Sequence, residues 1–118
     1  PKYAAAYYNK GVLLDRLLKH DDALEYIEKA IKIEPKKANP RFYKGIVLGK
    51  MQKHERALNC FENVYRANRN HLDALFHTGV ELAQLNIHET SEQMLFVHLL
   101  LKIYNLQLLL NYLPNYFE

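Results

Sequence analysis

Three glycines in this sequence are separated by 34 residues each: Gly11, Gly45 and Gly79. Glycine inside a helix costs about 1 kcal/mol relative to alanine, so regularly spaced glycines in a helix-favouring sequence need a structural reason. A constant period of this length is typical of repeat proteins, in which each unit buries its apolar face against the next. The spacing therefore predicts an internal repeat.

Other residues recur in the same register. A leucine follows each glycine by three residues, a histidine follows it by nine and a small residue follows it by twelve. In chain order these residues are Leu14, Leu48 and Leu82; His20, His54 and His88; and Ala23, Ala57 and Ser91. The chain has only four glycines and four prolines, too few for the many turns of an all-β protein. We therefore expect helical repeats.

The pattern resembles the tetratricopeptide repeat, whose signature is W-x2-L-G-x2-Y, then A-x3-F, then P. The first copy reads Tyr7-x2-Lys10-Gly11-x2-Leu14, then Ala23-x3-Ile27, then Pro35. The resemblance covers roughly residues 4–97. It implies an all-α fold, an α-solenoid of three helix-turn-helix units, to which the apolar composition of the last residues adds an apolar C-terminal helix.

The expected repeats span residues 1–37, 38–71 and 72–103, and an apolar helix or tail follows at 104–118. Within them we expect helices near residues 3–18, 21–34, 38–52, 55–68, 72–86 and 89–102. Small residues that face one another allow two helices to approach closer than the usual distance of about 8–10 Å. The residues expected to pack in this way are Gly11, Ala23, Gly45, Ala57, Gly79 and Ser91.

A concave groove is lined by the first helix of each repeat in tetratricopeptide arrays. The positions that the resemblance implies for this groove are Tyr8, Asn9, Val12, Arg16, Phe42, Tyr43, Ile46, Lys50, Phe76, His77 and Val80. Tyr8, Phe42 and Phe76 hold equivalent positions and would form an aromatic ladder. These rings either pack between neighbouring repeats or anchor a peptide or helix of a partner, and both interpretations stay open.

Some tetratricopeptide modules hold a C-terminal aspartate carboxylate in a clamp of lysine, asparagine and arginine. This sequence has Tyr8 and Val12 at the first two clamp positions, and Asp73 and His77 at those of the third repeat. Without these cationic and amide donors, we expect no binding of a chaperone tail by that clamp.

We expect no enzyme activity, because the sequence has no H-E-x-x-H, phosphate-binding glycine loop or G-x-S-x-G motif. His20, His54 and His88 lie on successive repeats, too far apart to share one zinc ion. Cys60 is the single cysteine, so it has no second thiol for a disulfide or a metal. We expect no metal and no cofactor, and a reducing, cytoplasmic location.

Charge is unevenly distributed along the chain. Residues 1–70 contain 15 Lys and Arg and 8 acids, a net charge of +7, whereas residues 71–118 contain one Lys and 5 acids, a net charge of −4. This asymmetry suggests an RNA-binding helical-repeat module as an alternative function. Few of the expected groove positions are basic, however, and phosphate binding needs many cations. We therefore expect a protein or peptide partner rather than nucleic acid.

An apolar segment follows the third repeat. Fifteen of the twenty residues from Met94 to Leu113 are apolar, and Lys102 is the only formal charge among them. A helix that is apolar all round is buried or lies in a membrane. The segment could pack as an extra helix, self-associate with another copy, dock to a membrane or come from a shifted reading frame near residue 88. We favour the first two together, with self-association through residues 94–113.

Overall fold

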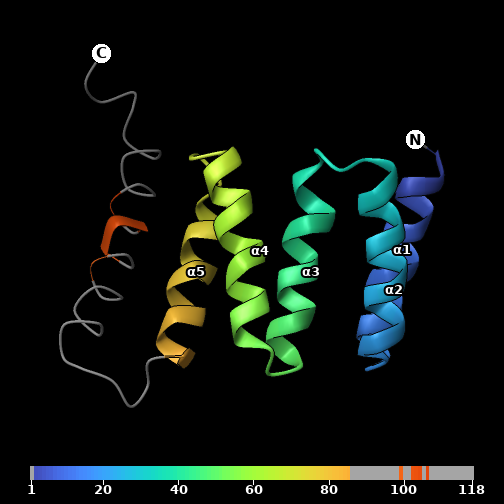
Figure 1. Ribbon diagram of the computed structural model, residues 1–118, viewed down its shortest axis with the longest axis horizontal. Helices are drawn as coiled ribbons and strands as arrows, with labels where there is room; N and C mark the ends of the chain where they lie inside the picture. The colour runs from blue at the N-terminus through green and yellow to red at the C-terminus, as the bar shows by residue number, and fades with distance from the viewer. Residues whose placement is uncertain (1, 86–98, 100–101, 105, 107–118) are drawn as a thin grey trace.

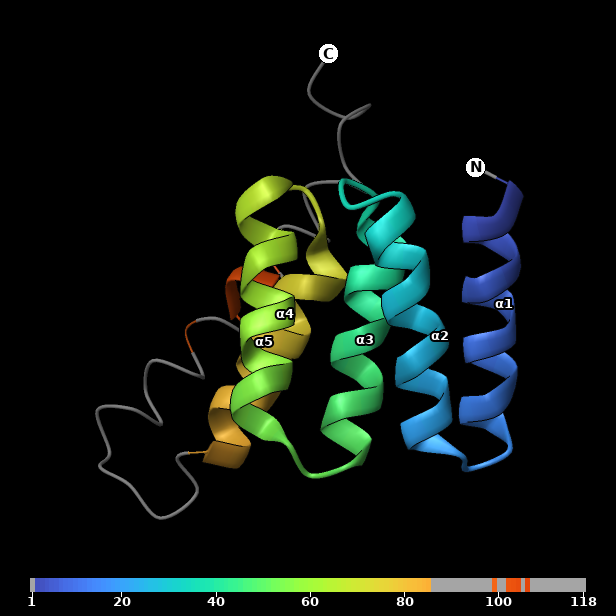
Figure 2. The same cartoon turned by 45° about the vertical axis from the view of Figure 1, so that its right-hand side comes forward.

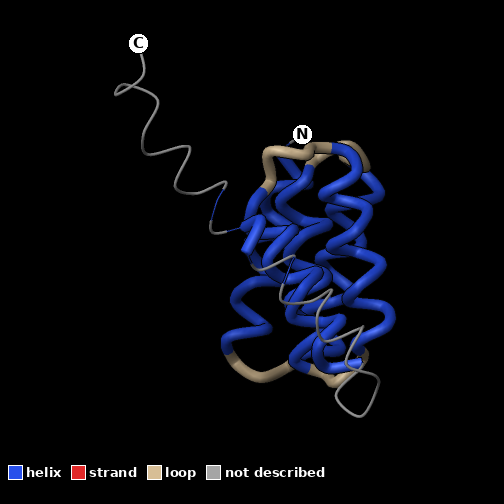
Figure 3. The backbone as a smooth tube through the Cα atoms, turned by 90° about the vertical axis from the view of Figure 1, so that its left-hand side faces the viewer, coloured by secondary structure: helices blue, strands red, loops and turns tan. Residues whose placement is uncertain are grey.

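The structure is a computed structural model that describes residues 2–85, 99, 102–104 and 106. Residues 2–85 form five α-helices, each packed against the next in sequence. They are α1 (Lys2–Arg16), α2 (His20–Ile33), α3 (Ala38–Lys50), α4 (His54–Ala67) and α5 (Leu72–Leu85). Figure 1 shows them side by side in chain order, and Figure 3 shows that the connecting loops lie at the two ends of the helices. The predicted all-α solenoid is confirmed.

Helices α1 and α3 each end two residues earlier than predicted, at Arg16 and Lys50. Leu18 and Gln52, which hold equivalent positions in their repeats, have φ angles of 63° and 64°. A residue in the left-handed conformation ends a helix. The amide of the next residue can then donate a hydrogen bond to one of the last carbonyl groups of that helix. Both loops have this hydrogen bond at 2.9 Å, from Lys19 N–H to Leu14 O and from Lys53 N–H to Leu48 O. The second helix of each pair therefore begins one residue after that amide.

Replacing Leu18 with glycine is expected to stabilise the protein. A non-glycine residue in the left-handed region is strained by about 1–2 kcal/mol, and Leu18 buries little in return because 79% of it is exposed. Glycine also gains freedom in the unfolded chain, so we expect a net increase of about 0.5–1 kcal/mol in the free energy of unfolding. Urea denaturation followed by circular dichroism measures it. A matched Leu17→Gly variant should show no increase, because Leu17 does not have a positive φ angle.

The core shows what the repeated glycines do. A Cβ on Gly11 would lie 2.6 Å from Ile27 Cγ1 and 3.1 Å from the Ala23 carbonyl oxygen, and one on Gly45 would lie 2.7 Å from the Phe61 ring. Each glycine thus makes room for a large side chain sixteen residues later, and Gly11 also faces the Ala23 backbone. The buried core around them consists of Ala23, Leu24, Ile27, Val47, Leu48, Ala57 and Phe61.

The third repeat is described only in part. Gly79 is buried in α5, but its expected partner Ser91 lies outside the described residues. The predicted helix at 89–102 and the tail at 104–118 also lie mostly outside them. Those that are described, Leu99, residues 102–104 and Leu106, are helical.

Candidate functional site

A cavity of about 370 Å³ lies between α3 and α5, the first helices of the second and third repeats. Four of the predicted groove residues line it together: Ile46, Lys50, His77 and Val80. Ile46 and Val80 contribute aliphatic walls, and Lys50 contributes an ammonium group. The cavity therefore combines apolar surface with a small number of polar groups, as ligand pockets usually do.

Gly49 opens one side of this cavity. A Cβ at this position would lie 2.7 Å from Glu81 Oε1, so a larger residue would displace the Glu81 carboxylate from its present place. Gly49 stands four residues after Gly45, where the first repeat has Asp15. The sequence interpretation missed Glu81 as a lining residue.

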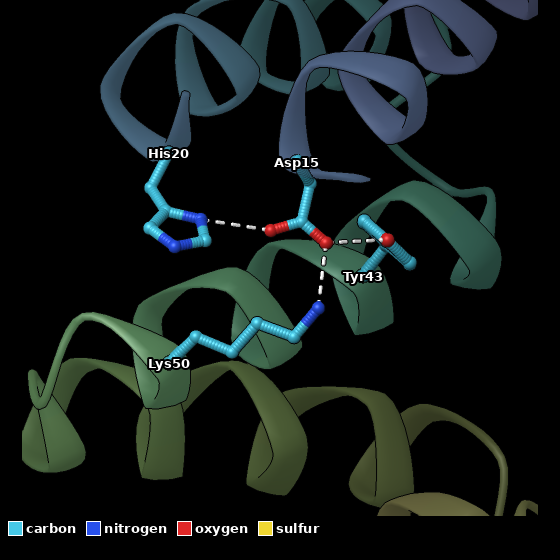
Figure 4. A network of polar contacts seen from close by, with 4 residues as sticks. All are labelled: Asp15, His20, Tyr43 and Lys50. Carbon is cyan, nitrogen blue, oxygen red and sulfur yellow. Dashed lines mark hydrogen bonds and ion pairs between the residues drawn. The ribbon is translucent and has the colours of Figure 1, made fainter. Parts of the chain in front are cut away.

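A buried carboxylate joins the first two repeats at Asp15, whose side chain has no exposed surface. Its Oδ1 accepts a hydrogen bond from His20 Nδ1 at 2.9 Å. Its Oδ2 accepts two more at 2.7 Å, from the Tyr43 hydroxyl and from Lys50 Nζ (Figure 4). Tyr43 and Lys50 come from α3, so the carboxylate on α1 fixes the position of the second repeat relative to the first. It also fixes two predicted groove residues.

At the junction of the second and third repeats, a histidine again contacts a buried carboxylate. Here the carboxylate comes from the later repeat, whereas at the first junction it comes from the earlier one. Glu81 of α5 is buried, and its Oε2 lies 2.6 Å from Nδ1 of His54, the repeat equivalent of His20. His54 Nε2 lies 3.0 Å from Gln52 Oε1 at the cavity rim. The two described repeat histidines therefore hold buried carboxylates at the repeat junctions. His88, the third, lies outside the described residues.

The electrostatics of the Asp15 cluster follow from its geometry. Burial alone would raise the pKa of the Asp15 carboxyl. The hydrogen bonds and charge that Lys50, Tyr43 and His20 contribute outweigh burial, so the pKa lies below its ordinary value. Burial, together with the adjacent carboxylate, raises the pKa of Tyr43 to about 12. Asp15 is therefore a charged acceptor and Tyr43 a neutral donor at neutral pH.

The aromatic side chains predicted for the groove have different neighbours. The Phe42 ring is half-buried, with its centroid 5.4 Å from those of Phe61 and His77 and 5.0 Å from that of His71. Phe76 is 36% exposed and lies 5.1 Å from the Tyr104 ring. Phe42 thus packs between the second and third repeats, whereas Phe76 keeps accessible surface.

The predicted groove positions on α1 differ in their exposure and contacts. The Tyr8 ring is half-buried and meets the Tyr43 ring edge-on, with 6.0 Å between centroids. Val12 is half-buried, and Asn9 and Arg16 are exposed. The contact between Tyr8 and Tyr43 places one predicted groove residue of α1 beside one of α3.

His77 connects the cavity to the core. Its ring stacks on Phe61 with centroids 5.0 Å apart. Burial lowers the pKa of His77, although the negative charges of Asp73 and Glu81 act in the opposite direction. The imidazole is therefore neutral at neutral pH. It presents a flat polar ring to the cavity rather than a cation.

Some of the basic charge in the N-terminal two-thirds is paired with acids. Ion pairs form between Lys29 and Glu25, Lys37 and Glu34, Lys44 and Glu28, Lys50 and Asp15, and Arg66 and Glu62. Cys60 is half-buried on α4, and burial raises the pKa of its thiol, as expected of a packing residue.

Two kinds of feature are absent from the described part of the chain. Within residues 2–85 and the few described positions beyond them, no group of three His, Cys, Asp or Glu side chains could hold a metal ion. None of the helices in that part is long and apolar enough to cross a membrane.

Comparison with known proteins identifies the repeat. Residues 4–37 match the tetratricopeptide repeat family. The fold is similar to the crystal structure of MamA protein, with a TM-score of 0.71 and 18% identity over 98% of this chain and 58% of that chain. It is also similar to the first TPR of Spaghetti (RPAP3) bound to HSP90 peptide SRMEEVD, with a TM-score of 0.66 and 14% identity over 86% of this chain and 93% of that chain. No curated protein matches. The chain thus spans little more than half of the MamA structure.

Proposed function

We propose that this chain, whose residues 4–37 match the tetratricopeptide repeat family, is a non-enzymatic scaffold that binds a partner peptide or helix on the face formed by α1, α3 and α5. The observation that carries the proposal is the cavity between α3 and α5. Its aliphatic walls, Ile46 and Val80, suit an apolar side chain of the partner. Lys50 and Gln84 at the same cavity suit the peptide backbone or an adjacent polar group.

A peptide-bound relative supports this mode of binding. The Spaghetti (RPAP3) domain, which has the same fold, is bound to the peptide SRMEEVD. This chain would select a different sequence, because Tyr8, Val12 and Asp73 stand at positions where a carboxylate clamp needs lysine, asparagine or other donors. The aliphatic cavity favours a partner with a buried apolar anchor.

The groove is tested with peptides selected from a random display library against the intact protein. We expect Val80→Glu to weaken the selected peptides at least about tenfold, or 1.4 kcal/mol, because it places a charge against the apolar anchor. Asn59→Glu adds the same charge at an exposed position of α4 and should leave affinity unchanged. Fluorescence anisotropy of a labelled peptide measures the affinity of each variant.

Three results would count against this mode. Equal affinity of the two variants would place the peptide elsewhere. Tight binding of SRMEEVD would contradict the expected selectivity. Binding that falls steeply with salt, for labelled single-stranded RNA and not for peptides, would favour the nucleic-acid alternative.

A further inference from the structure

The buried carboxylates at the two repeat junctions differ in their hydrogen-bond donors. Asp15 has donors at both oxygens, one at Oδ1 and two at Oδ2. Glu81 has a donor at one oxygen: its Oε2 lies 2.6 Å from His54 Nδ1, and within residues 2–85 no group donates a hydrogen bond to Oε1. A buried carboxylate oxygen without a donor is unfavourable, because burial removes most of its water. Glu81 Oε1 is therefore available to a donor from outside this part of the chain.

The repeat register shows which donors the second carboxylate lacks. The two groups that donate to Asp15 Oδ2 come from Tyr43 and Lys50. Thirty-four residues later the chain has His77 and Gln84. Neither is charged at neutral pH, since burial lowers the pKa of His77 and glutamine does not ionise. Each junction has one histidine at its carboxylate, so the second junction differs from the first by the absence of the lysine.

The unsatisfied oxygen lies at the cavity between α3 and α5. Glu81 and Gly49 both line this cavity, and a Cβ on Gly49 would lie 2.7 Å from Glu81 Oε1. Oε1 is therefore next to a lining position that has no side chain. Helix α4, which carries His54, packs against both α3 and α5 (Figure 2). Only 8% of the Glu81 side chain is exposed, so its charge is poorly screened by water and interacts strongly with a nearby cation.

Lys50 also lines the cavity, but its charge is already balanced. Its Nζ lies 2.7 Å from Asp15 Oδ2, in the first of the two carboxylates. Among the described residues that line the cavity, Lys50 is the only Lys or Arg. Glu81 thus has no lysine or arginine of its own there. This distribution of charge favours a cationic group over an anionic one beside Glu81.

We propose that the cavity binds a Lys or Arg side chain of the partner, whose charged group donates a hydrogen bond to Glu81 Oε1. The inference rests on the proposed binding of a peptide or helix at this cavity and adds the chemistry of a second contact beside the apolar anchor. The aliphatic part of a Lys or Arg side chain can lie along Ile46 and Val80 while its charged end reaches the carboxylate. The partner then supplies at the second junction the cation that Lys50 supplies at the first.

The experiment uses the peptides selected from the display library against the intact protein. We expect them to carry Lys or Arg at a constant spacing from the apolar anchor. Replacing this basic residue with glutamine should weaken binding to the unchanged protein at least about tenfold, because it removes one partner of a desolvated charge pair. Glu81→Gln keeps the shape of the side chain without its charge, so there the same replacement should change the affinity less than about threefold. Fluorescence anisotropy of the labelled peptides measures all four affinities.

Gln84→Lys tests the same contact without altering the buried carboxylate. Gln84 is exposed, lines the cavity and stands three residues after Glu81, so a lysine there lies on the same side of α5. It supplies the missing cation from within the protein and should weaken the basic peptide at least about tenfold, and its glutamine version much less. Asn59→Lys adds the same charge at an exposed position of α4 and should leave both affinities unchanged. If circular dichroism shows that Glu81→Gln loses its helices, this pair of variants decides.

The outcomes separate this inference from the proposed function. Val80→Asn disturbs the apolar wall without adding charge, so it should weaken both versions of the peptide if the groove is correct. Given that result, selected peptides without a basic residue would overturn the inference alone. So would a basic residue whose replacement costs the same in Glu81→Gln as in the unchanged protein, because the cation would then bind elsewhere. Equal affinity of Val80→Asn and the unchanged protein would remove the groove, and the inference with it.

Discussion

Phe61→Ala is expected to lower the free energy of unfolding by about 3–5 kcal/mol, as for other large aromatic residues removed from a core. The side chain is fully buried on α4. Its ring lies 5.4 Å from that of Phe42 on α3 and 5.0 Å from that of His77 on α5, measured between centroids. One side chain thus joins three helices and two repeats. Urea denaturation at neutral pH measures the loss, and a loss below about 1 kcal/mol would show that the core is not centred on this ring.

Gly45 makes that prediction more specific through a double-mutant cycle. In the unchanged protein, the Cβ of Gly45→Ala would lie 2.7 Å from the buried Phe61 ring. Overpacking of this kind costs about 1–3 kcal/mol, which exceeds the roughly 1 kcal/mol that alanine gains over glycine in a helix. We therefore expect Gly45→Ala to lower the free energy of unfolding of the otherwise unchanged protein.

In the Phe61→Ala background the clash is absent, so the sign of the Gly45→Ala effect should reverse. Alanine then differs from glycine only in its higher helix propensity. We therefore expect Gly45→Ala to raise the free energy of unfolding by up to about 1 kcal/mol in this background. The cycle isolates the contact between the two positions from their separate effects. Equal effects of Gly45→Ala in both backgrounds would mean that glycine is present for a reason other than Phe61.

The period of the glycines predicted the fold because it reports packing that every repeat must make. Gly11 and Gly45 leave space for Ile27 and Phe61, and this contact recurs in the same register. The sequence prediction placed the ends of α1 and α3 two residues too late, because no residue type near these ends signals a helix stop. Leu18 and Gln52 adopt the left-handed conformation that glycine usually takes, so their residue types give no stop signal.

The buried carboxylates were missed because they do not recur at one position. At the first junction the carboxylate comes from Asp15 on α1. At the second, Gly49 stands at the equivalent position and Glu81 of α5 supplies the carboxylate instead. A periodic pattern reveals contacts that use the same residue each time. It does not reveal one contact made by residues on different helices.

The candidate site was predicted in part. Ile46, Lys50, His77 and Val80 were expected on the groove side, and all four line the cavity between α3 and α5. The sequence could not separate packing from accessibility for Phe42. Its ring lies against Phe61 and two histidines, a set of contacts that involves residues distant in sequence.

Asp15→Ala is expected to lower the free energy of unfolding by roughly 3 kcal/mol, the lower end for removing one partner of a buried ion pair, because Lys50 is half exposed. The change leaves Lys50, Tyr43 and His20 without their acceptor. It also frees the second repeat to move relative to the first. Glu25→Ala removes an exposed pair with Lys29 on α2 and should cost less than about 1 kcal/mol.

The pH dependence separates the charge of Asp15 from its packing. The folded-state pKa of Asp15 lies below the ordinary value of 3.8, so the unfolded chain takes up this proton first as the pH falls. The stabilisation is therefore complete above pH 3.8 and is lost as the pH falls through the folded-state pKa. Asp15→Asn keeps the shape without the charge, so it should be less stable than the unchanged protein at neutral pH.

The difference in unfolding free energy between the unchanged protein and Asp15→Asn should stay constant from neutral pH down to the pH at which Asp15 begins to titrate, and should shrink below it. Protonation of groups that do not contact Asp15, including His77, whose pKa burial lowers, changes both proteins alike and cancels in the difference. Urea denaturation across this pH range gives the curve. A difference that is the same at all pH values would mean that Asp15 acts through shape alone. The junction of the first two repeats would then depend on packing rather than on the buried charge.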